Sequence, residues 1–272
     1  MGFCRTFATG ATLVLAFAAG PALAAAGCDA KDPATSIGLG GGECFSFHAS
    51  PNPRQGTPLI VFMHGDGGGE ISSGYWDVLI KQGDALAASA NVTFVVLVRP
   101  GYRGPGGRSS GLAKAGDDDY TVSNVKLAAE AISALKARFQ PSRTIVGGTS
   151  GGAAIAALIM GRHPGVADAA WLTACPCQVQ PWRQWRAQST GKPGLWSSLS
   201  PDENIPGIAP GARIVVVAGD KDENTLMRFS EAYVATAKAR GVNVQLVMAP
   251  GAVHGMVWRS KEAAAALAAL AH

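Results

Sequence analysis

A serine surrounded by glycines is the first residue in this sequence whose setting suggests chemistry. Ser150 lies in the stretch VGGTSGGAAIAAL, where Gly148 and Gly152 give the spacing Gly-x-Ser-x-Gly. An apolar run precedes the serine and an alanine-rich run follows it, which predicts a tight turn between a strand and a helix. In that context the spacing is typical of a nucleophilic serine, because the turn lifts the hydroxyl above the edge of a sheet. The alternative is a glycine-rich turn that holds an ordinary serine.

A serine hydroxyl is a weak nucleophile without a base, and the sequence contains five histidines. His254 follows an apolar run at 242–248 and precedes a helical pattern at 258–271, so it is expected on a loop beyond the carboxyl end of a strand. Loops at that edge carry the chemistry of open parallel sheets, and we predict His254 as the base. The other histidines lie in the N-terminal arm, in a glycine-rich loop, at a helix end and at the C-terminus: His48, His64, His163 and His272.

The base needs an acid that orients it. The stretch IVVVAGDKDENT offers Asp220, Asp222 and Glu223 just beyond another apolar run. Asp222 lies far enough along this loop to reach a neighbouring histidine, whereas Asp220 directly follows Gly219 and is better placed to shape the turn. We predict Asp222 as the acid. For each of these residues the alternative is a turn or a helix N-cap.

A tetrahedral intermediate also needs hydrogen-bond donors for its negative oxygen. The stretch MHGDGGGE follows an apolar run, and its glycines would expose backbone N–H groups. We predict that the amides of Asp66 and Gly151 form this oxyanion hole, and that His64 is structural and bonds within its own loop. The alternatives are a flexible loop and a phosphate-binding loop, although the Lys-Ser or Lys-Thr pair of a phosphate-binding loop is missing.

Alternating apolar runs and helical patterns must position these residues. Strands are predicted at 58–64, 92–98, 143–147, 169–174, 212–219 and 242–248, and helices at 74–90, 121–139, from about 151, at 224–240 and at 258–271. Continuous apolar strands that alternate with helices indicate an α/β fold, with a mostly parallel sheet covered on both faces. We expect residues 27–272 to form one domain. The least regular stretch, 175–211, is predicted to be a functional loop or a small, loop-rich cap.

The N-terminus has the pattern of a secretory signal peptide. Arg5 precedes the short apolar run ATLVLAFAA, and the small residues of ALAAAG offer a cleavage site, so residues 1–26 are predicted to be removed and the protein to be secreted or periplasmic. Four cysteines then remain, and we predict two disulfides, Cys28–Cys44 and Cys175–Cys177. Alternatively, AAGC is a weak lipobox, and Cys28 would then carry a lipid anchor.

Charge and hydropathy exclude several classes of partner. The net charge of +4 is spread along 272 residues without a basic run, which argues against nucleic acid. The apolar segments that follow the predicted signal peptide are too short or too polar to span a membrane. We expect a monomer that acts on a small molecule.

The chain order Ser150, Asp222, His254, with a His-Gly loop after an earlier strand, resembles the α/β-hydrolase family. Two segments resemble its dienelactone-hydrolase-like and prolyl-oligopeptidase-like members: SLSPDENIPGIAPGARIVVVAGDKDE and RPGYRGPGGRSSG. The resemblance implies the α/β-hydrolase fold and attack of Ser150 on an ester, thioester or amide carbonyl. It also implies that His254 takes and returns the proton, that water hydrolyses the acyl-enzyme, and that neither a metal nor an organic cofactor is required.

We therefore expect an exported serine esterase that cleaves carboxylic esters. One alternative is a serine peptidase of the prolyl-oligopeptidase type. Such peptidases usually need an N-terminal anchoring domain, which the short arm before the first strong strand cannot form. The other alternative is a non-catalytic binding protein on the hydrolase scaffold. Such proteins commonly lose a triad residue, whereas all three candidates are present here.

Aromatic and basic residues are the candidates for substrate contacts. Three tryptophans follow the run at 169–174, namely Trp182, Trp185 and Trp196. They either line an aromatic or acyl pocket or pack the cap onto the domain. Three arginines lie on the loop after 92–98, and a solvated loop face is expected for them in preference to contact with a substrate carboxylate: Arg99, Arg103 and Arg108.

Overall fold

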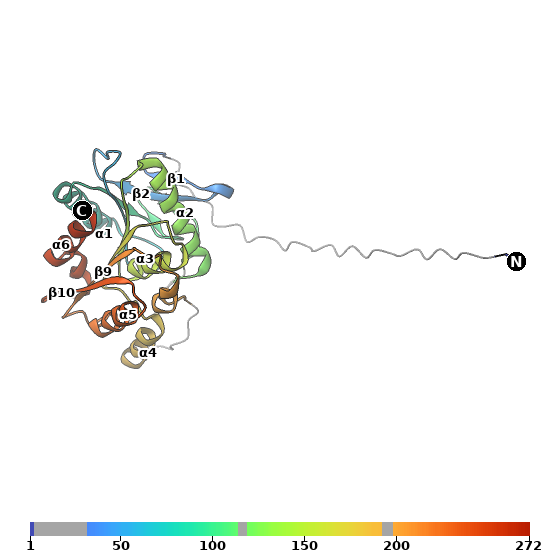
Figure 1. The fold of residues 1–272 in the computed structure, drawn as a ribbon. Helices are drawn as coiled ribbons and strands as arrows, with labels where there is room; N and C mark the ends of the chain where they lie inside the picture. Colours follow the sequence, from blue (N-terminus) through green and yellow to red (C-terminus); the bar gives the residue numbers. More distant parts are fainter. Residues whose placement is uncertain (3–31, 114–118, 192–197) are drawn as a thin grey trace.

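A twisted sheet with helices on both faces forms the body of the molecule (Figure 1). The computed structural model describes residues 1–2, 32–113, 119–191 and 198–272; most of the predicted signal peptide, with Cys28, lies outside these residues. The strands of the large sheet are β1 (Ser36–Gly38), β2 (Cys44–Ala49), β3 (Leu59–Met63), β4 (Thr93–Leu97), β7 (Thr144–Thr149), β8 (Ala169–Thr173), β9 (Arg213–Gly219) and β10 (Asn243–Ala249). A separate small hairpin pairs β5 (Arg103–Gly104) with β6 (Gly107–Arg108).

The order of strands across the large sheet is β1-β2-β4-β3-β7-β8-β9-β10. β4, β3, β7, β8, β9 and β10 pair in parallel, whereas β1 and β2 join one edge in antiparallel fashion. The carboxyl ends of β3, β7, β9 and β10 therefore meet at one edge of the sheet. The loops after these four strands carry the four predicted site segments, so the topology brings together residues that are far apart in the sequence.

Helices cover each face of the sheet (Figure 1). The helices are α1 (Ser73–Ala90), α2 (Val122–Phe139), α3 (Gly151–Arg162), α4 (Val179–Thr190), α5 (Met227–Ala239) and α6 (Lys261–Ala271), with short 3-10 turns η1 (Gly40–Gly42), η2 (Pro201–Gly207) and η3 (His254–Arg259). α2, α3 and α5 pack on one face, and α1 and α6 pack on the other. β3 shows why both faces are apolar: Val61 enters the first core and Phe62 the second, because successive side chains point to opposite faces.

The predicted α/β fold is confirmed, and three of its boundaries differ from the prediction in ways that affect the site or the end of the chain. β7 extends to Thr149, which leaves a single residue between strand and helix. α5 begins at Met227 rather than near 224. The helix predicted at 258–271 is divided into η3 and α6, and the Ser260 side chain caps α6 by accepting a hydrogen bond from the amide of Ala263.

The predicted cap contains a helix that the sequence reading missed. α4 lies within the stretch 175–211, which we expected to be irregular. Its proline, Pro181, lies in the first turn, where a missing N–H costs no helical hydrogen bond. Gly191 ends the helix in the left-handed conformation, with φ of 68°.

Two of the predicted disulfide cysteines are joined in the structure. The Cys175–Cys177 bond follows β8 and is fully buried. Cys44 is also disulfide-bonded, to a partner outside the described residues, so its pairing with Cys28 stays a prediction. Of the helices that the structure describes, none has the length and apolar character needed to cross a membrane.

Candidate active site

Ser150 is the single residue between β7 and α3, and its backbone is strained. Its φ of 53° and ψ of −124° are unusual for a residue with a side chain. Neighbouring hydrogen bonds hold it there: the Ser150 amide donates to the carbonyl of Thr173 (3.0 Å), and the Ser150 carbonyl accepts from the amide of Ala153 (2.9 Å). Such strain persists only where the surroundings fix it, and it is common at active sites.

The glycines around Ser150 are needed because other backbone lies against them. A Cβ on Gly148 would lie 2.4 Å from the carbonyl carbon of Gly152, and a Cβ on Gly152 would lie 2.1 Å from the carbonyl oxygen of Met63. A Cβ on Gly151 would lie 2.2 Å from the carboxylate of Asp66. Glycine is needed on both sides of the serine because β3, β7 and α3 approach one another too closely to leave room for side chains at these positions.

His254 and Asp222, the predicted base and its acid, are hydrogen-bonded. His254 Nδ1 lies 2.9 Å from Asp222 Oδ2 and 3.1 Å from Oδ1. Asp222 lies on the loop after β9, and His254 is the first residue of η3 beyond β10. The exposed Asp220 instead accepts a hydrogen bond from the amide of Gly251 (2.6 Å), which connects the loop after β9 to the turn after β10.

The Asp222 carboxylate is buried and held in its charged form. Oδ1 accepts hydrogen bonds from the amides of Asn224 and Thr225, both at 2.8 Å. Burial alone would raise the pKa of Asp222, but hydrogen bonds from His254 and Thr225 lower it below its usual value. Asp222 can therefore orient the imidazole and stabilise it when it becomes protonated.

Thr225 is a site residue that the sequence analysis missed. Its hydroxyl lies 2.7 Å from Asp222 Oδ2, 3.1 Å from the carbonyl oxygen of Ala174 and 3.3 Å from His254 Nδ1. The only available signal was a threonine three positions after an aspartate, which is also common in ordinary turns.

Ser150 and His254 line the same cavity of about 520 Å³. Within the described part of the chain, Ser150 Oγ and the His254 ring are not hydrogen-bonded to each other. In unliganded active sites such bonds are often long and shorten only in the substrate complex. The geometry thus brings the predicted nucleophile and base to one cavity, with the base already oriented by its acid.

The glycine-rich loop after β3 lies beside the serine. A Cβ on Gly65 would lie 3.3 Å from Ser150 Cβ and 3.9 Å from Ser150 Oγ. Within the described parts of the chain, the amides of Asp66 and Gly151 donate no hydrogen bond. Gly151 is also the first residue of α3, where the helix dipole favours negative charge. The Asp66 amide therefore lies on the loop beside the nucleophile, and the Gly151 amide lies at the start of α3, directly after the nucleophile.

The Asp66 carboxylate is paired with neighbouring side chains. Its negative charge is therefore compensated and repels a negative oxygen of the substrate less strongly. Oδ1 accepts from Arg99 Nη1 (2.6 Å), and Oδ2 accepts from the Tyr120 hydroxyl (2.8 Å). Burial works against the charge of Arg99, but the Asp66 carboxylate raises the pKa of Arg99. The expectation of a solvated loop face was wrong for Arg99, whose side chain is 1% exposed. A buried guanidinium is tolerated here because a carboxylate neutralises it.

His64 is structural, as predicted, and the geometry fixes its tautomer. Nε2 lies 3.0 Å from the Arg99 amide and accepts its hydrogen, so Nδ1 carries the ring proton and donates to the Gly65 carbonyl (2.8 Å). Burial and the charge of Arg99 lower the pKa of His64 to about 3. The imidazole is therefore neutral at physiological pH, and it connects the glycine-rich loop to the chain after β4.

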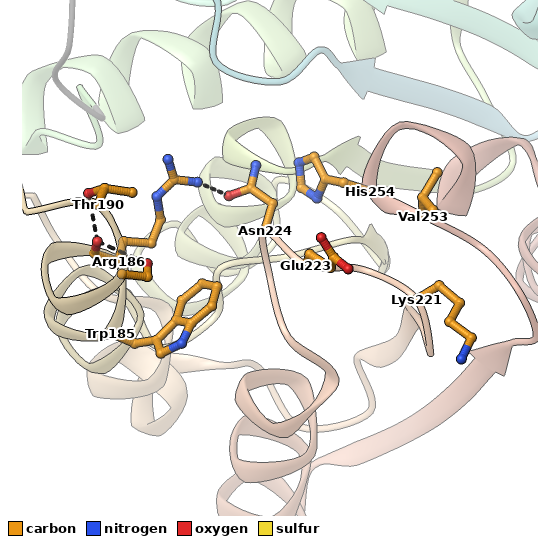
Figure 2. Close-up of a pocket in the computed structure, with 9 residues that line it drawn as sticks. Trp185, Arg186, Thr190, Lys221, Glu223, Asn224, Val253 and His254 are labelled. Atoms are coloured by element: carbon orange, nitrogen blue, oxygen red, sulfur yellow. Dashed lines mark hydrogen bonds between the residues drawn. The ribbon is translucent and has the colours of Figure 1, made fainter.

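Of the three candidate tryptophans, the two that the structure describes both line cavities and pack the cap. Trp182 is buried, lines the serine cavity and donates from Nε1 to the carbonyl of Asn224 (2.7 Å). Trp185 lines an adjoining cavity of about 620 Å³ (Figure 2). It packs against Phe229, with ring centroids 5.9 Å apart. Trp196 lies outside the described residues. Both explanations offered for the tryptophans therefore apply to the described pair.

Comparisons with known proteins show the family of the chain. The sequence profile of the prolyl oligopeptidase family matches residues 85–271. No curated protein matches the chain in sequence. The described side chains include no cluster of three or more His, Cys, Asp or Glu that could hold a metal ion.

Solved structures share the fold at low sequence identity. The Pyrococcus furiosus esterase Pf2001 has a TM-score of 0.63 at 14% identity, over 86% of this chain and 89% of its own. The esterase PE8 has a TM-score of 0.57 at 17% identity, over 83% of this chain and 97% of its own. A Mycobacterium tuberculosis puromycin-hydrolyzing peptidase has a TM-score of 0.63 at 17% identity, over 87% of this chain but only 39% of its own.

Proposed function

Because the chain belongs to the prolyl oligopeptidase family and is a serine hydrolase, we propose that it cleaves carboxylic esters through Ser150, His254 and Asp222. The observation that carries this proposal is the Asp222–His254 hydrogen bond, at 2.9 Å, beside a cavity that also contains the strained Ser150. The proposal keeps the predicted roles of all three residues.

The reaction begins when Ser150 Oγ attacks the ester carbonyl and His254 Nε2 takes the serine proton. The His254 Nδ1–H donates to Asp222, whose charge stabilises the imidazolium that forms. The amides of Gly151 and Asp66 donate to the negative oxygen of the tetrahedral intermediate. His254 then protonates the departing alcohol, and the same steps with water in place of the serine release the acid and regenerate Ser150.

Two observations favour esters over peptides. The chain matches esterase structures over most of their length, whereas it matches only 39% of the puromycin-hydrolyzing peptidase chain. The serine cavity, at about 520 Å³, also lies in the range of small-molecule sites. Peptide cleavage remains the second candidate, because the family description names an oligopeptidase.

A labelling experiment and a substrate comparison test the proposal. A fluorophosphonate probe should label the wild type but not Ser150→Ala, and kcat/KM should be higher for p-nitrophenyl acyl esters than for aminoacyl arylamides.

Asp222→Asn should lose about a thousandfold or more in kcat, because the imidazole loses its correct tautomer, while Asp220→Asn retains activity. Equal activity of both aspartate variants would contradict the acid assignment, and faster cleavage of arylamides would favour a peptidase.

We also propose that the enzyme is exported. The signal-like residues 1–26 support this, as does the Cys175–Cys177 bond, since disulfides persist in oxidising compartments. Expression of the full chain followed by cell fractionation and intact mass measurement tests the proposal. A mature protein that starts near residue 27 is expected outside the cytoplasm, whereas an uncleaved cytoplasmic chain would contradict it.

A further inference from the structure

We propose that the serine site takes esters that carry a carboxylate, and that Arg186 of α4, assisted by Arg183, binds that carboxylate. This inference rests on the proposed esterase function and names its substrate class. Arg183 and Arg186 are three residues apart on α4 and therefore lie on one face of the helix. Both line the cavity that contains Ser150 and His254.

Arg186 lies where the two cavities of the site meet. It lines the serine cavity and also the adjoining cavity, together with Asn224 and His254. Figure 2 shows its guanidinium reaching from α4 to the Asn224 side chain, on the same side of the cavity as the His254 ring. Arg186 Nη1 donates to Asn224 Oδ1, which fixes the position of the guanidinium. A group bound beside this guanidinium would therefore lie close to the reacting centre.

Arg186 brings a positive charge to the serine cavity. Among the described residues that line this cavity the one carboxylate is Asp66, which is already paired with Arg99. In the adjoining cavity Lys221 and Glu223 carry opposite charges. Among the residues that the structure describes, no carboxylate lies within ion-pair distance of Arg186, and Asn224 is the only acceptor of its guanidinium hydrogens. The cavity therefore presents a cation whose charge the described protein groups do not neutralise.

A guanidinium in this setting suits a carboxylate better than a neutral group. It has five N–H donors in a planar fork that matches the two oxygens of a carboxylate, and Asn224 accepts from only one nitrogen. The guanidinium carbons of Arg183 and Arg186 lie 4.5 Å and 5.7 Å from the centre of the Trp182 ring. This contact with an aromatic ring and the partial burial of both arginines reduce the mobility of the fork before substrate binds.

Paired substrates of equal shape test this inference. The p-nitrophenyl monoester of glutaric acid is compared with p-nitrophenyl 5-methylhexanoate, in which an isopropyl group replaces the carboxylate. A second pair places the charge on the leaving group: 4-acetoxybenzoate and 4-isopropylphenyl acetate. The measured quantity is the ratio of kcat/KM for the charged ester to that for its neutral partner, in the wild type and in Arg186→Gln, Arg186→Glu and Arg183→Gln/Arg186→Gln. Arg240→Gln, on the exposed end of α5, removes the same charge far from both cavities and is the control.

We expect the ratio for at least one pair to fall about tenfold in Arg186→Gln, further in the double variant and in Arg186→Glu, and not in Arg240→Gln. The pair that responds shows whether the acyl group or the alcohol carries the carboxylate. Equal ratios in Arg186→Gln and Arg240→Gln for both pairs would overturn the carboxylate site while leaving the esterase proposal intact. Failure of the wild type to cleave any of the four esters, with no fluorophosphonate labelling of Ser150, would instead refute the esterase proposal.

Discussion

The Asp222 carboxylate accepts hydrogen bonds from other residues besides His254, and Thr225 provides two of them. The Thr225 amide donates to Oδ1 (2.8 Å), and the Thr225 hydroxyl lies 2.7 Å from Oδ2. The same hydroxyl lies 3.1 Å from the Ala174 carbonyl at the end of β8. Thr225 thus fixes the acid relative to the sheet, and the acid fixes the imidazole. We infer that Thr225 is a positioning residue for His254.

Replacing Thr225 with valine keeps the shape but removes the hydroxyl. We expect kcat for a p-nitrophenyl ester to fall about tenfold with little change in KM, because a hydrogen bond to a charged group is lost while substrate contacts remain. Thr225→Ser restores the hydroxyl and should recover most of kcat. If the serine and valine variants are equally impaired, the hydroxyl has no positioning role.

The close contacts around the serine predict opposite effects for two glycine substitutions. Gly148→Ala places a Cβ 2.4 Å from backbone and should destabilise the fold by about 3 kcal/mol or more. Gly74→Ala, in the first turn of α1, meets no atom within 4 Å and should stabilise it by about 0.5 kcal/mol. Urea unfolding of both variants, followed by circular dichroism, measures the difference. Equal stability of the two variants would contradict the packing described around Ser150.

At the scale of elements, the glycine-rich loop after β3 is held from two sides. Arg99, directly beyond β4, and Tyr120, just before α2, both bind the carboxylate of Asp66. Burial, followed by the charge of Asp66, raises the pKa of Tyr120, so its hydroxyl stays protonated and remains a donor. Two neighbouring elements thereby fix the loop whose amides are proposed to face the oxyanion.

Tyr120→Phe removes one of these two restraints without changing the fold. We expect a fall of about tenfold in kcat and a small change in KM, because a less ordered Asp66 amide affects the transition state more than substrate binding. Tyr233→Phe is the matched control, since the buried Tyr233 hydroxyl has no hydrogen-bond partner among the residues that the structure describes. Steady-state kinetics measure kcat and KM of the two variants. Equal kcat values would show that the Asp66–Tyr120 hydrogen bond does not support the glycine-rich loop after β3.

The sequence was sufficient for the elements whose pattern is local. Buried strands such as β3 are continuous apolar runs, and the turn at Ser150 is recognisable from its glycines and flanking elements. α4 was missed because its sequence is polar and aromatic: only Val179 and Trp182 are buried, and neither contact can be inferred from periodicity. Thr225, Asn224 and the pairing of Arg99 with Asp66 were missed for a related reason. These roles depend on contacts between loops that only the folded sheet brings together.

At the scale of the whole molecule, the buried Asp222 makes stability depend on pH. Its pKa is lower in the folded state than in an unfolded chain, where aspartate has a pKa of about 3.9. Its contribution is therefore complete above that value and is lost as pH falls through the folded pKa. The wild type should be more stable than Asp222→Asn at pH 7, and the difference should shrink towards pH 3. Urea unfolding at both pH values measures it, with Asp220→Asn as the surface control, and a constant difference would contradict the proposed linkage.

Asn224 joins the cap to the acid loop through three contacts. Its carbonyl accepts from Trp182, its side-chain oxygen accepts from Arg186, and its amide donates to Asp222. A designer who grafts the cap of another hydrolase onto this body would therefore disturb the catalytic machinery as well as the pocket. A working chimera would need the new helix and the short acid loop to be transplanted together, as one cassette.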